Sequence, residues 1–122
     1  MKTLFLLFAA SFLSIAFAFV PPTHNIVGHW FTTNPDGSKN YVDLKSDGTF
    51  ASYYKEKLIH YGNYTFNDPV VSITDTEDDA CGGGYWGKYN ANFVGEDSVT
   101  LVLVEDSCTG RSQGVNGMGL RR

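Results

Sequence analysis

The sequence predicts an all-β protein, an antiparallel up-and-down β-barrel of about eight short strands. The chain has 122 residues, among them 13 glycines, nine phenylalanines and seven tyrosines, a composition that favours strands and tight turns. Turn-forming residues recur at the spacing of short hairpins. After residue 22, no segment repeats apolar residues with helical spacing over three turns. An open β-sandwich is the competing architecture.

The expected strands are separated by turn sequences. In chain order they cover residues 26–32, 41–45, 49–55, 58–66, 70–74, 85–94 and 98–104, and the tail 110–120 is the eighth. Gly48 is able to take the positive φ of a tight turn. The connections are too short for parallel crossovers, which need a dozen or more residues. Asn116-Gly117 is a hairpin-type dipeptide, so the last strand is either broken there or contains a bend or bulge.

Residues 1–18 are predicted to be a signal peptide, and residues 19–122 a single β-barrel domain. A lysine precedes an apolar run that closes with Ala16-Phe17-Ala18, the small residues that signal peptidase accepts. The alternative, a transmembrane anchor, needs about 18 to 20 apolar residues, whereas Pro21-Pro22 ends this run. We therefore expect a secreted, extracellular protein without a membrane span.

The only two cysteines are Cys81 and Cys108. In an oxidising extracellular compartment their pairing is the expected state. Closing a loop over 27 positions stabilises the fold by about 3 to 4 kcal/mol in the chain-entropy model. A two-cysteine zinc site is disfavoured, because no histidine stands at ligand spacing. Asn63-Tyr64-Thr65 is the one glycosylation sequon, and its use requires a eukaryotic secretory route.

Charge and motif content narrow the function. The net charge of -4 argues against a nucleic-acid partner, which would require a clustered basic face. The three histidines, His24, His29 and His60, form no catalytic set. Nucleophile motifs, H-E-x-x-H and phosphate-binding loops are absent from the sequence. We therefore expect a protein that is not an enzyme and that uses no cofactor.

An acidic run lies in the longest expected loop. Its four carboxylates, from Asp75, Glu77, Asp78 and Asp79, fall within five residues. Carboxylate oxygens suit calcium, so these residues are candidates for a weak calcium or mineral contact. EF-hand spacing is absent, which argues against a high-affinity metal site. The alternative is a solvated loop.

Several local patterns follow one another in a characteristic order. They are Ile26-Val27-Gly28-His29-Trp30, then Leu44-Lys45-Ser46-Asp47-Gly48-Thr49-Phe50 with Gly62-Asn63-Tyr64-Thr65-Phe66, and finally Val99 to Val104 followed by Asp106-Ser107-Cys108-Thr109-Gly110-Arg111. This order resembles the small lipocalin-like domains of the calycin superfamily, over nearly all of residues 26–121. The resemblance implies an antiparallel barrel whose interior often holds a small apolar molecule.

The same resemblance implies how one end of the barrel is closed. Trp30 would close that end, and Arg121 from the last strand would cover the tryptophan. The sequence departs from the family pattern in the last strand. There Gly117-Met118-Gly119-Leu120 stands where a large apolar or aromatic residue is expected.

Aromatic residues on the inner faces of the expected strands define a candidate ligand site. By alternation along residues 58–66, His60 and Tyr64 point inward while Asn63 points outward, as a glycan requires. The candidate lining residues are Phe50, Tyr54, His60, Tyr64, Tyr85 and Tyr89. Such residues either line a pocket for a small apolar ligand or fill a small barrel completely.

Two functions are consistent with these patterns. The first is a secreted binding module for a small apolar ligand, which a cavity above about 300 Å³ would favour. The second is a structural component of an extracellular or mineralised matrix, with contacts made by the acidic loop and by surface tyrosines. An exposed stripe of Tyr53, Tyr61 and Trp86 would favour the second function.

Overall fold

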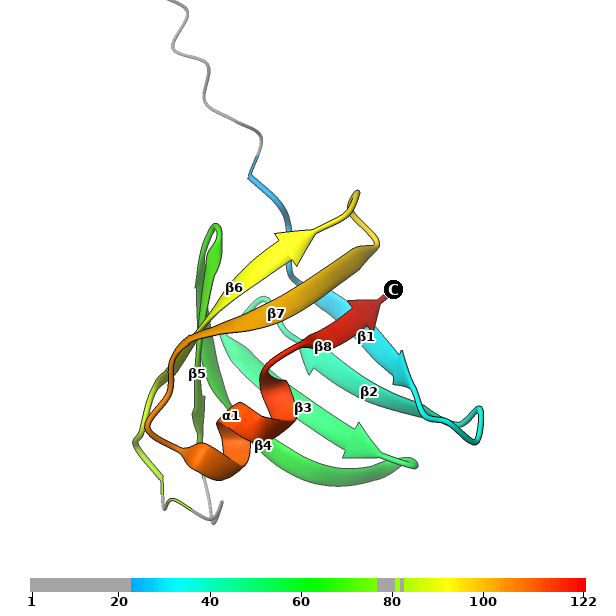
Figure 1. Ribbon diagram of the computed structural model, residues 1–122, viewed down its shortest axis with the longest axis horizontal. Coiled ribbons are helices and arrows are strands. Elements are labelled where there is room, and N and C mark those ends of the chain that lie inside the picture. The colour runs from blue at the N-terminus through cyan, green and yellow to red at the C-terminus, as the bar shows by residue number, and fades with distance from the viewer. Residues whose placement is uncertain (1–22, 77–80, 82) are drawn as a thin grey trace, which may run out of the picture.

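The computed structural model describes residues 23–76, 81 and 83–122, and the predicted signal peptide lies outside these residues. The described chain forms one closed antiparallel barrel whose strands are neighbours in chain order (Figure 1). The elements are β1 (Gly28–Thr33), β2 (Lys39–Leu44), β3 (Thr49–Tyr54), β4 (Lys57–Asn67), β5 (Val70–Asp75), β6 (Gly87–Phe93), β7 (Ser98–Glu105), α1 (Thr109–Val115) and β8 (Met118–Arg121). The predicted fold class is confirmed, and the open sandwich is excluded.

The connections between strands fall at two ends of the barrel, because successive strands run in opposite directions. The closed end, as we call it, holds the segment 23–27, the turns 45–48, 68–69 and 94–97, and the C-terminal Arg122. The open end holds the connections 34–38 and 55–56, the described residues between β5 and β6, and the connection 106–117, which contains α1. Figure 1 shows α1 between the end of β7 and the start of β8.

Apolar side chains fill the barrel at its closed end. Trp30 and Tyr89 have no exposed surface, and Leu120, Val71 and Val99 are almost fully buried. The Phe93 ring packs near both Trp30 and Phe66, with ring centroids 6.3 Å apart in each pair. These residues alternate with outward-facing polar residues, as the period of a strand requires.

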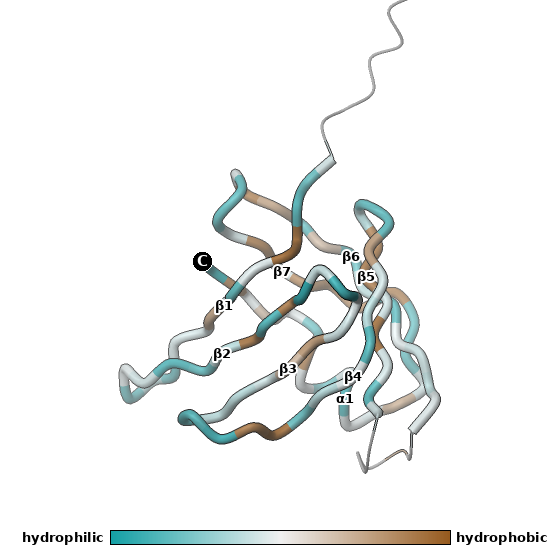
Figure 2. Tube along the Cα trace, turned by 180° about the vertical axis from the view of Figure 1, so that it is seen from behind, coloured by the Kyte–Doolittle hydropathy of each residue, from teal (hydrophilic) through white to brown (hydrophobic). Residues whose placement is uncertain are grey.

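Two hairpin turns have the backbone geometry that tight turns need. Gly48 has a φ of +82°, as predicted, and the Asp47 carboxylate accepts hydrogen bonds from the Thr49 amide and hydroxyl at 2.9 and 2.6 Å. Lys55 and Glu56, between β3 and β4, also have positive φ values. Figure 2 shows that this hairpin tip is hydrophilic and that a hydrophobic stretch follows it at the start of β4.

A β-bulge changes which side chains of β4 enter the barrel. Ser52 pairs with His60 and Tyr53 pairs with Leu58, so Ile59 is the extra residue on β4. An extra residue breaks the strict alternation of the strand. As a result, the adjacent residues Ile59 and His60 both line the cavity, although both remain exposed, Ile59 at 45%.

The tail prediction is wrong in part: residues 109–115 form α1, and only β8 is a strand. The Asn116 amide makes the last bond of the helix, to the Ser112 carbonyl at 3.0 Å. The helix ends there because the Asn116 backbone is extended, with a ψ of 122°, and Gly117 then has a φ of +82°. The hairpin-type dipeptide therefore marks the end of a helix. Four residue pairs join β8 to β7, and the pair Phe31–Arg121 joins β8 to β1 and closes the barrel.

Candidate ligand-binding cavity

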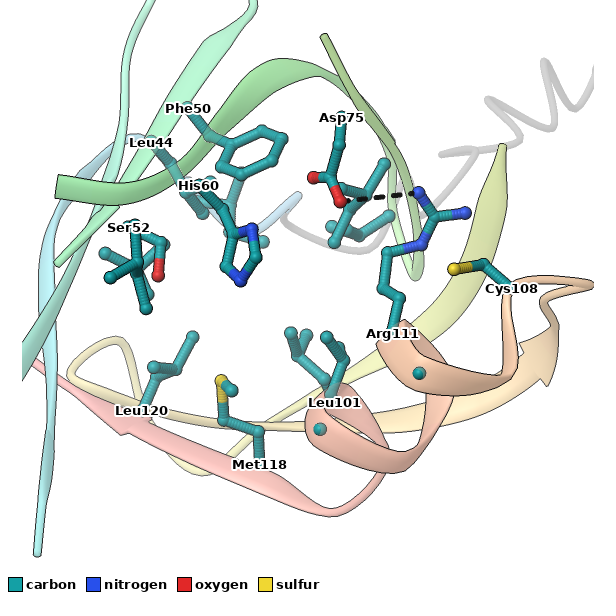
Figure 3. Close-up of a pocket in the computed structure, with 18 residues that line it drawn as sticks. Leu44, Phe50, Ser52, His60, Asp75, Leu101, Cys108, Arg111, Met118 and Leu120 are labelled. Carbon is teal, nitrogen blue, oxygen red and sulfur yellow. Dashed lines mark ion pairs between the residues drawn. The ribbon is translucent and has the colours of Figure 1, made fainter. Parts of the chain in front are cut away.

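The barrel contains a cavity of about 460 Å³ toward its open end (Figure 3). Its walls are mainly apolar, with side chains that include Val42, Leu44, Phe50, Leu101, Met118 and Leu120. Four polar side chains also line it: Ser52, His60, Asp75 and Arg111. The barrel is therefore filled at the closed end and hollow toward the open end, so each of the two sequence-based alternatives describes one part of it.

Helix α1 forms one wall of the cavity. Gly110, Arg111, Gly114 and Val115 line the cavity from this helix, and Met118 follows at the start of β8. Glycines add no side-chain volume, so the helix covers the barrel without filling it. Figure 3 shows α1 on the opposite side of the cavity from Phe50 and His60.

A buried ion pair fixes the start of α1 to the barrel. Arg111 donates from Nε and Nη2 to the two carboxylate oxygens of Asp106, at 2.8 and 2.9 Å. The Asp106 side chain is fully buried, and that of Arg111 is 6% exposed. The hydrogen bond to Asp106 raises the pKa of Arg111, although burial acts in the opposite direction. The pair is bidentate, the strongest geometry for arginine and a carboxylate.

Asp106 has further donors besides Arg111. The Tyr89 hydroxyl donates to it, and the Cys108 amide donates at 2.9 Å. Burial acts to raise the pKa of Asp106, but these hydrogen bonds outweigh burial and hold the pKa below its usual value. Burial and the contact with Asp106 both raise the pKa of Tyr89, so its hydroxyl stays protonated. A Cβ at Gly87 would lie 2.3 Å from the Asp106 carboxylate, so this close approach requires glycine.

Asp75 brings a second carboxylate to the same place. It ends β5, its side chain is 7% exposed, and it lines the cavity. Its Oδ2 lies 3.9 Å from Nη1 of Arg111, the ion pair drawn in Figure 3. Two carboxylates therefore flank one guanidinium at this wall of the cavity.

The predicted disulfide between Cys81 and Cys108 is present, with a Cα–Cα distance of 5.7 Å. It joins the β5–β6 connection to the residue that precedes α1. Cys108 also lines the cavity. The disulfide and the Asp106–Arg111 pair thus hold the same helix over the open end.

The structure brings only part of the predicted ligand site together. Phe50 and His60 line the cavity. Tyr64 and Tyr89 are buried in the core, outside the cavity wall. The Tyr64 hydroxyl donates to the Lys45 carbonyl at 2.6 Å, and burial raises the pKa of Tyr64. Both tyrosines therefore contribute to packing.

Tyr54 and Tyr85 are placed differently from the prediction. They are 48% and 54% exposed, and neither lines the cavity. Tyr54 is the last residue of β3, so it lies at the rim of the open end. Tyr85 precedes β6, which begins only at Gly87, because the Tyr85 carbonyl accepts a hydrogen bond from Arg111 at 2.8 Å instead of joining the sheet.

At the closed end, Trp30 lies where the resemblance implies, but the arginine over it is Arg122. The Arg122 guanidinium lies 4.3 Å from the Trp30 ring centroid, and its Nη1 donates to the Val27 carbonyl at 3.0 Å. Trp30 Nε1 donates to the Ile26 carbonyl at 2.9 Å. Because Leu120 points into the barrel, strand alternation turns Arg121 outward and brings Arg122 back over the core.

Of the residues that line the cavity, the sequence-based ligand site included only Phe50 and His60. Ile59 and Arg111 are two of those that it missed. Ile59 enters the wall through the bulge, which left no signal in the apolar alternation of the sequence. Arg111 stands inside the Asp-x-Cys-x-Gly-Arg segment that carried the family resemblance, and its charge in a disulfide-linked segment was a usable signal. Asn63 is exposed, and it lies on the opposite face of β4 from the buried Tyr64, as predicted.

The acidic run is described only at its first carboxylate. Asp75 lies at the end of a strand and is buried, while Glu77, Asp78 and Asp79 lie outside the described residues. Within residues 23–76, 81 and 83–122, no three His, Cys, Asp or Glu side chains gather as a metal site would require. None of the helices in the described part of the chain has the length and apolar character of a membrane span.

Comparison of the chain with protein families, with curated proteins and with solved structures finds no match. The closed eight-strand antiparallel barrel is compatible with a lipocalin-like fold.

Proposed function

We propose that the protein is a secreted β-barrel binding module for a small apolar ligand, a member of the lipocalin-like group. The observation that carries this proposal is the cavity of about 460 Å³ with its largely apolar walls. Ligand pockets of small molecules fall in the range of about 300 to 1,000 Å³. An interior of this size, lined by leucine, isoleucine, valine and phenylalanine, favours an apolar guest over water.

The anchoring of α1 supports the same proposal. A barrel that folded only for stability would gain from filling its interior, since each removed cavity stabilises the fold. Here two glycines of α1 face the cavity, and a disulfide and a buried ion pair hold the helix over it. The disulfide also supports secretion, because such bonds persist in oxidising compartments.

A fluorescence titration tests the proposal. The neutral apolar dye N-phenyl-1-naphthylamine gains emission when it leaves water for an apolar site. We expect a saturable increase with one site and a Kd of about 1 to 10 μM, a binding free energy of about 7 to 8 kcal/mol. An increase that stays linear with dye concentration would contradict the proposal.

A pair of matched variants locates the dye. Ser52 lines the cavity, whereas Ser72 on β5 alternates with the inward-facing Val71 and Ile73 and so points outward. Ser52→Phe fills part of the cavity, and we expect it to weaken dye binding at least tenfold. Ser72→Phe makes the same change on the outer face and should leave binding unchanged. Equal binding by both variants would place the dye elsewhere.

A role in an extracellular or mineralised matrix is the second candidate. Tyr61 and Trp86 are 40% and 47% exposed, which supports it, whereas Tyr53 is partly buried. Any contact with calcium would depend on the loop carboxylates Glu77, Asp78 and Asp79. Thermal stability that rises with calcium and no longer does so in an Asp78→Asn, Asp79→Asn variant would support this candidate.

A further inference from the structure

We infer that the cavity selects an apolar ligand with a cationic amine head and discriminates against the corresponding carboxylic acid. This inference rests on the proposed function and specifies the class of ligand. It follows from the charges that line the cavity. The described residues that line it include one carboxylate, Asp75, one guanidinium, Arg111, and one imidazole, His60.

The guanidinium is committed to protein partners. Nε and Nη2 of Arg111 donate three hydrogen bonds to the Asp106 carboxylate and the Tyr85 carbonyl, at 2.8 to 2.9 Å. Nη1 makes no hydrogen bond to the described residues, but it is buried and lies 3.9 Å from Oδ2 of Asp75. A ligand carboxylate would have to share this arginine with Asp106, whose side chain is fully buried and bound in bidentate geometry. The cation nearest the cavity therefore serves to balance the protein's own buried anion.

A second carboxylate stands beside the same guanidinium. Asp75 and Asp106 flank Arg111, so two acidic side chains share one basic side chain at this wall. Asp75 is the member that lines the cavity, beside apolar neighbours such as Ile73. Interactions between charges are much stronger in such a poorly hydrated place than in bulk water.

An ammonium group fits this wall better than a carboxylate. Moving any charge out of water is costly, and only a close opposite charge with hydrogen bonds offsets that cost. The Asp75 carboxylate offers acceptors to the three N–H donors of a primary ammonium, while the alkyl part of the ligand covers the apolar walls. A carboxylate head would meet like charge at Asp75 instead.

Displacement of the neutral dye by three matched ligands tests the inference. Octylamine, 1-octanol and octanoic acid share one chain length and differ in head charge at pH 7. We expect octylamine to displace the dye at a concentration at least tenfold lower than octanoate, with octanol between them. Displacement by octanoate at the same or a lower concentration than octylamine would overturn the inference.

Substitution of Asp75, with a control substitution elsewhere, tests whether this residue causes the preference for the amine. Asp75→Asn should remove the advantage of octylamine over octanol. Asp97→Asn makes the same charge change at a side chain that is 82% exposed in a turn of the closed end, and it should keep that advantage. A preference that survives in folded Asp75→Asn would contradict the role of Asp75. The wild-type series decides the ligand class if that variant does not fold.

The outcomes separate the two proposals. If the dye does not bind wild-type protein, the proposed function fails. If the dye binds and octanoate is preferred, the proposed function stands and the amine inference fails.

Discussion

Each end of the barrel has an arginine at its centre, but the interior is filled at one end and hollow at the other. At the closed end, the Arg122 guanidinium lies over the Trp30 ring, and the space behind the ring is filled. At the open end, Arg111 binds a buried carboxylate, and about 460 Å³ beside it stays empty of side chains. The first arginine covers an apolar core, and the second holds a helix in place.

The difference shows how a small barrel keeps a cavity without losing its fold. Packing alone would draw the open end inward, because apolar walls gain from closer contact. The directional bonds of Asp106, together with the disulfide, fix the distance of α1 from the sheet. Stability at the closed end thus comes from buried surface, and at the open end from a few specific bonds.

The largest expected effect is at the open end. Asp106→Ala removes the acceptor of Arg111, Tyr89 and the Cys108 amide, leaving a buried cation without its main partner. Breaking one side of a buried pair costs about 3 to 5 kcal/mol. Urea unfolding followed by tyrosine and tryptophan emission measures this loss.

Gly87→Ala provides an independent check of the same site. The new Cβ would overlap the Asp106 carboxylate, which its partners hold in place, so a clear loss of stability is expected. Gly28→Ala at the closed end places a Cβ 3.3 Å from the mobile tip of Arg122 and should cost much less. Equal losses for both variants would contradict the comparison.

Removal of the disulfide is expected to have the next largest effect. Cys81→Ala with Cys108→Ala should lower the free energy of unfolding by about 3 to 4 kcal/mol, the chain-entropy value for a loop of 27 positions. Because the bond holds the residue before α1, dye affinity should fall in the same variant. Unchanged affinity in protein that remains folded would show that the ion pair alone holds the helix.

A smaller effect is expected at the closed end. Arg122→Ala removes a cation over the Trp30 ring and a hydrogen bond to the Val27 carbonyl, at a cost of about 1 kcal/mol. Arg121→Ala is the matched control: its side chain is on the outer face, and its loss should change stability by less than about 0.5 kcal/mol. A larger loss of thermal stability for Arg121→Ala than for Arg122→Ala would support the sequence-based assignment of Arg121 as the residue that covers Trp30.

The barrel could be predicted from the sequence because the signals for strands and turns lie within short stretches of the chain. Turn residues such as Gly48 and the alternation along β4 decide strands without reference to distant parts of the chain. The two cysteines needed only an oxidising compartment to predict their bond. Local rules also account for the outward position of Asn63.

The residues of the candidate site were harder to predict from the sequence because their positions depend on contacts between distant parts of the chain. Tyr85 fell outside because its carbonyl binds Arg111, 26 positions later. Ile59 moved inward through a bulge that the register of β3 and β4 imposes. Arg122 lies over Trp30 in place of Arg121 because Leu120 points into the barrel, and the sequence did not predict the bounds of β8 that set this alternation.

Acid sensitivity compares a carboxylate at each end, and the smallest effect is expected for Asp68 at the closed end. The backbone amide and the ring of His24 hold the pKa of Asp68 below its usual value, at hydrogen-bond distances of 2.9 Å. Asp106 also has a lowered pKa, from Arg111, Tyr89 and Cys108 acting against burial. Such groups stabilise the fold above the unfolded pKa of about 3.9, and this stabilisation is lost as the pH falls through the folded pKa.

Urea midpoints measured from pH 6 down to pH 2 test both groups. The difference between wild type and Asp106→Asn should be large at pH 6 and shrink below pH 4, as the wild-type carboxylate takes up its proton. Asp68→Asn should show the same trend with a smaller difference, because water and salt screen an exposed pair. A constant difference for Asp106→Asn across this range would mean that shape, rather than charge, sets its contribution, and the open end would then resemble the closed end.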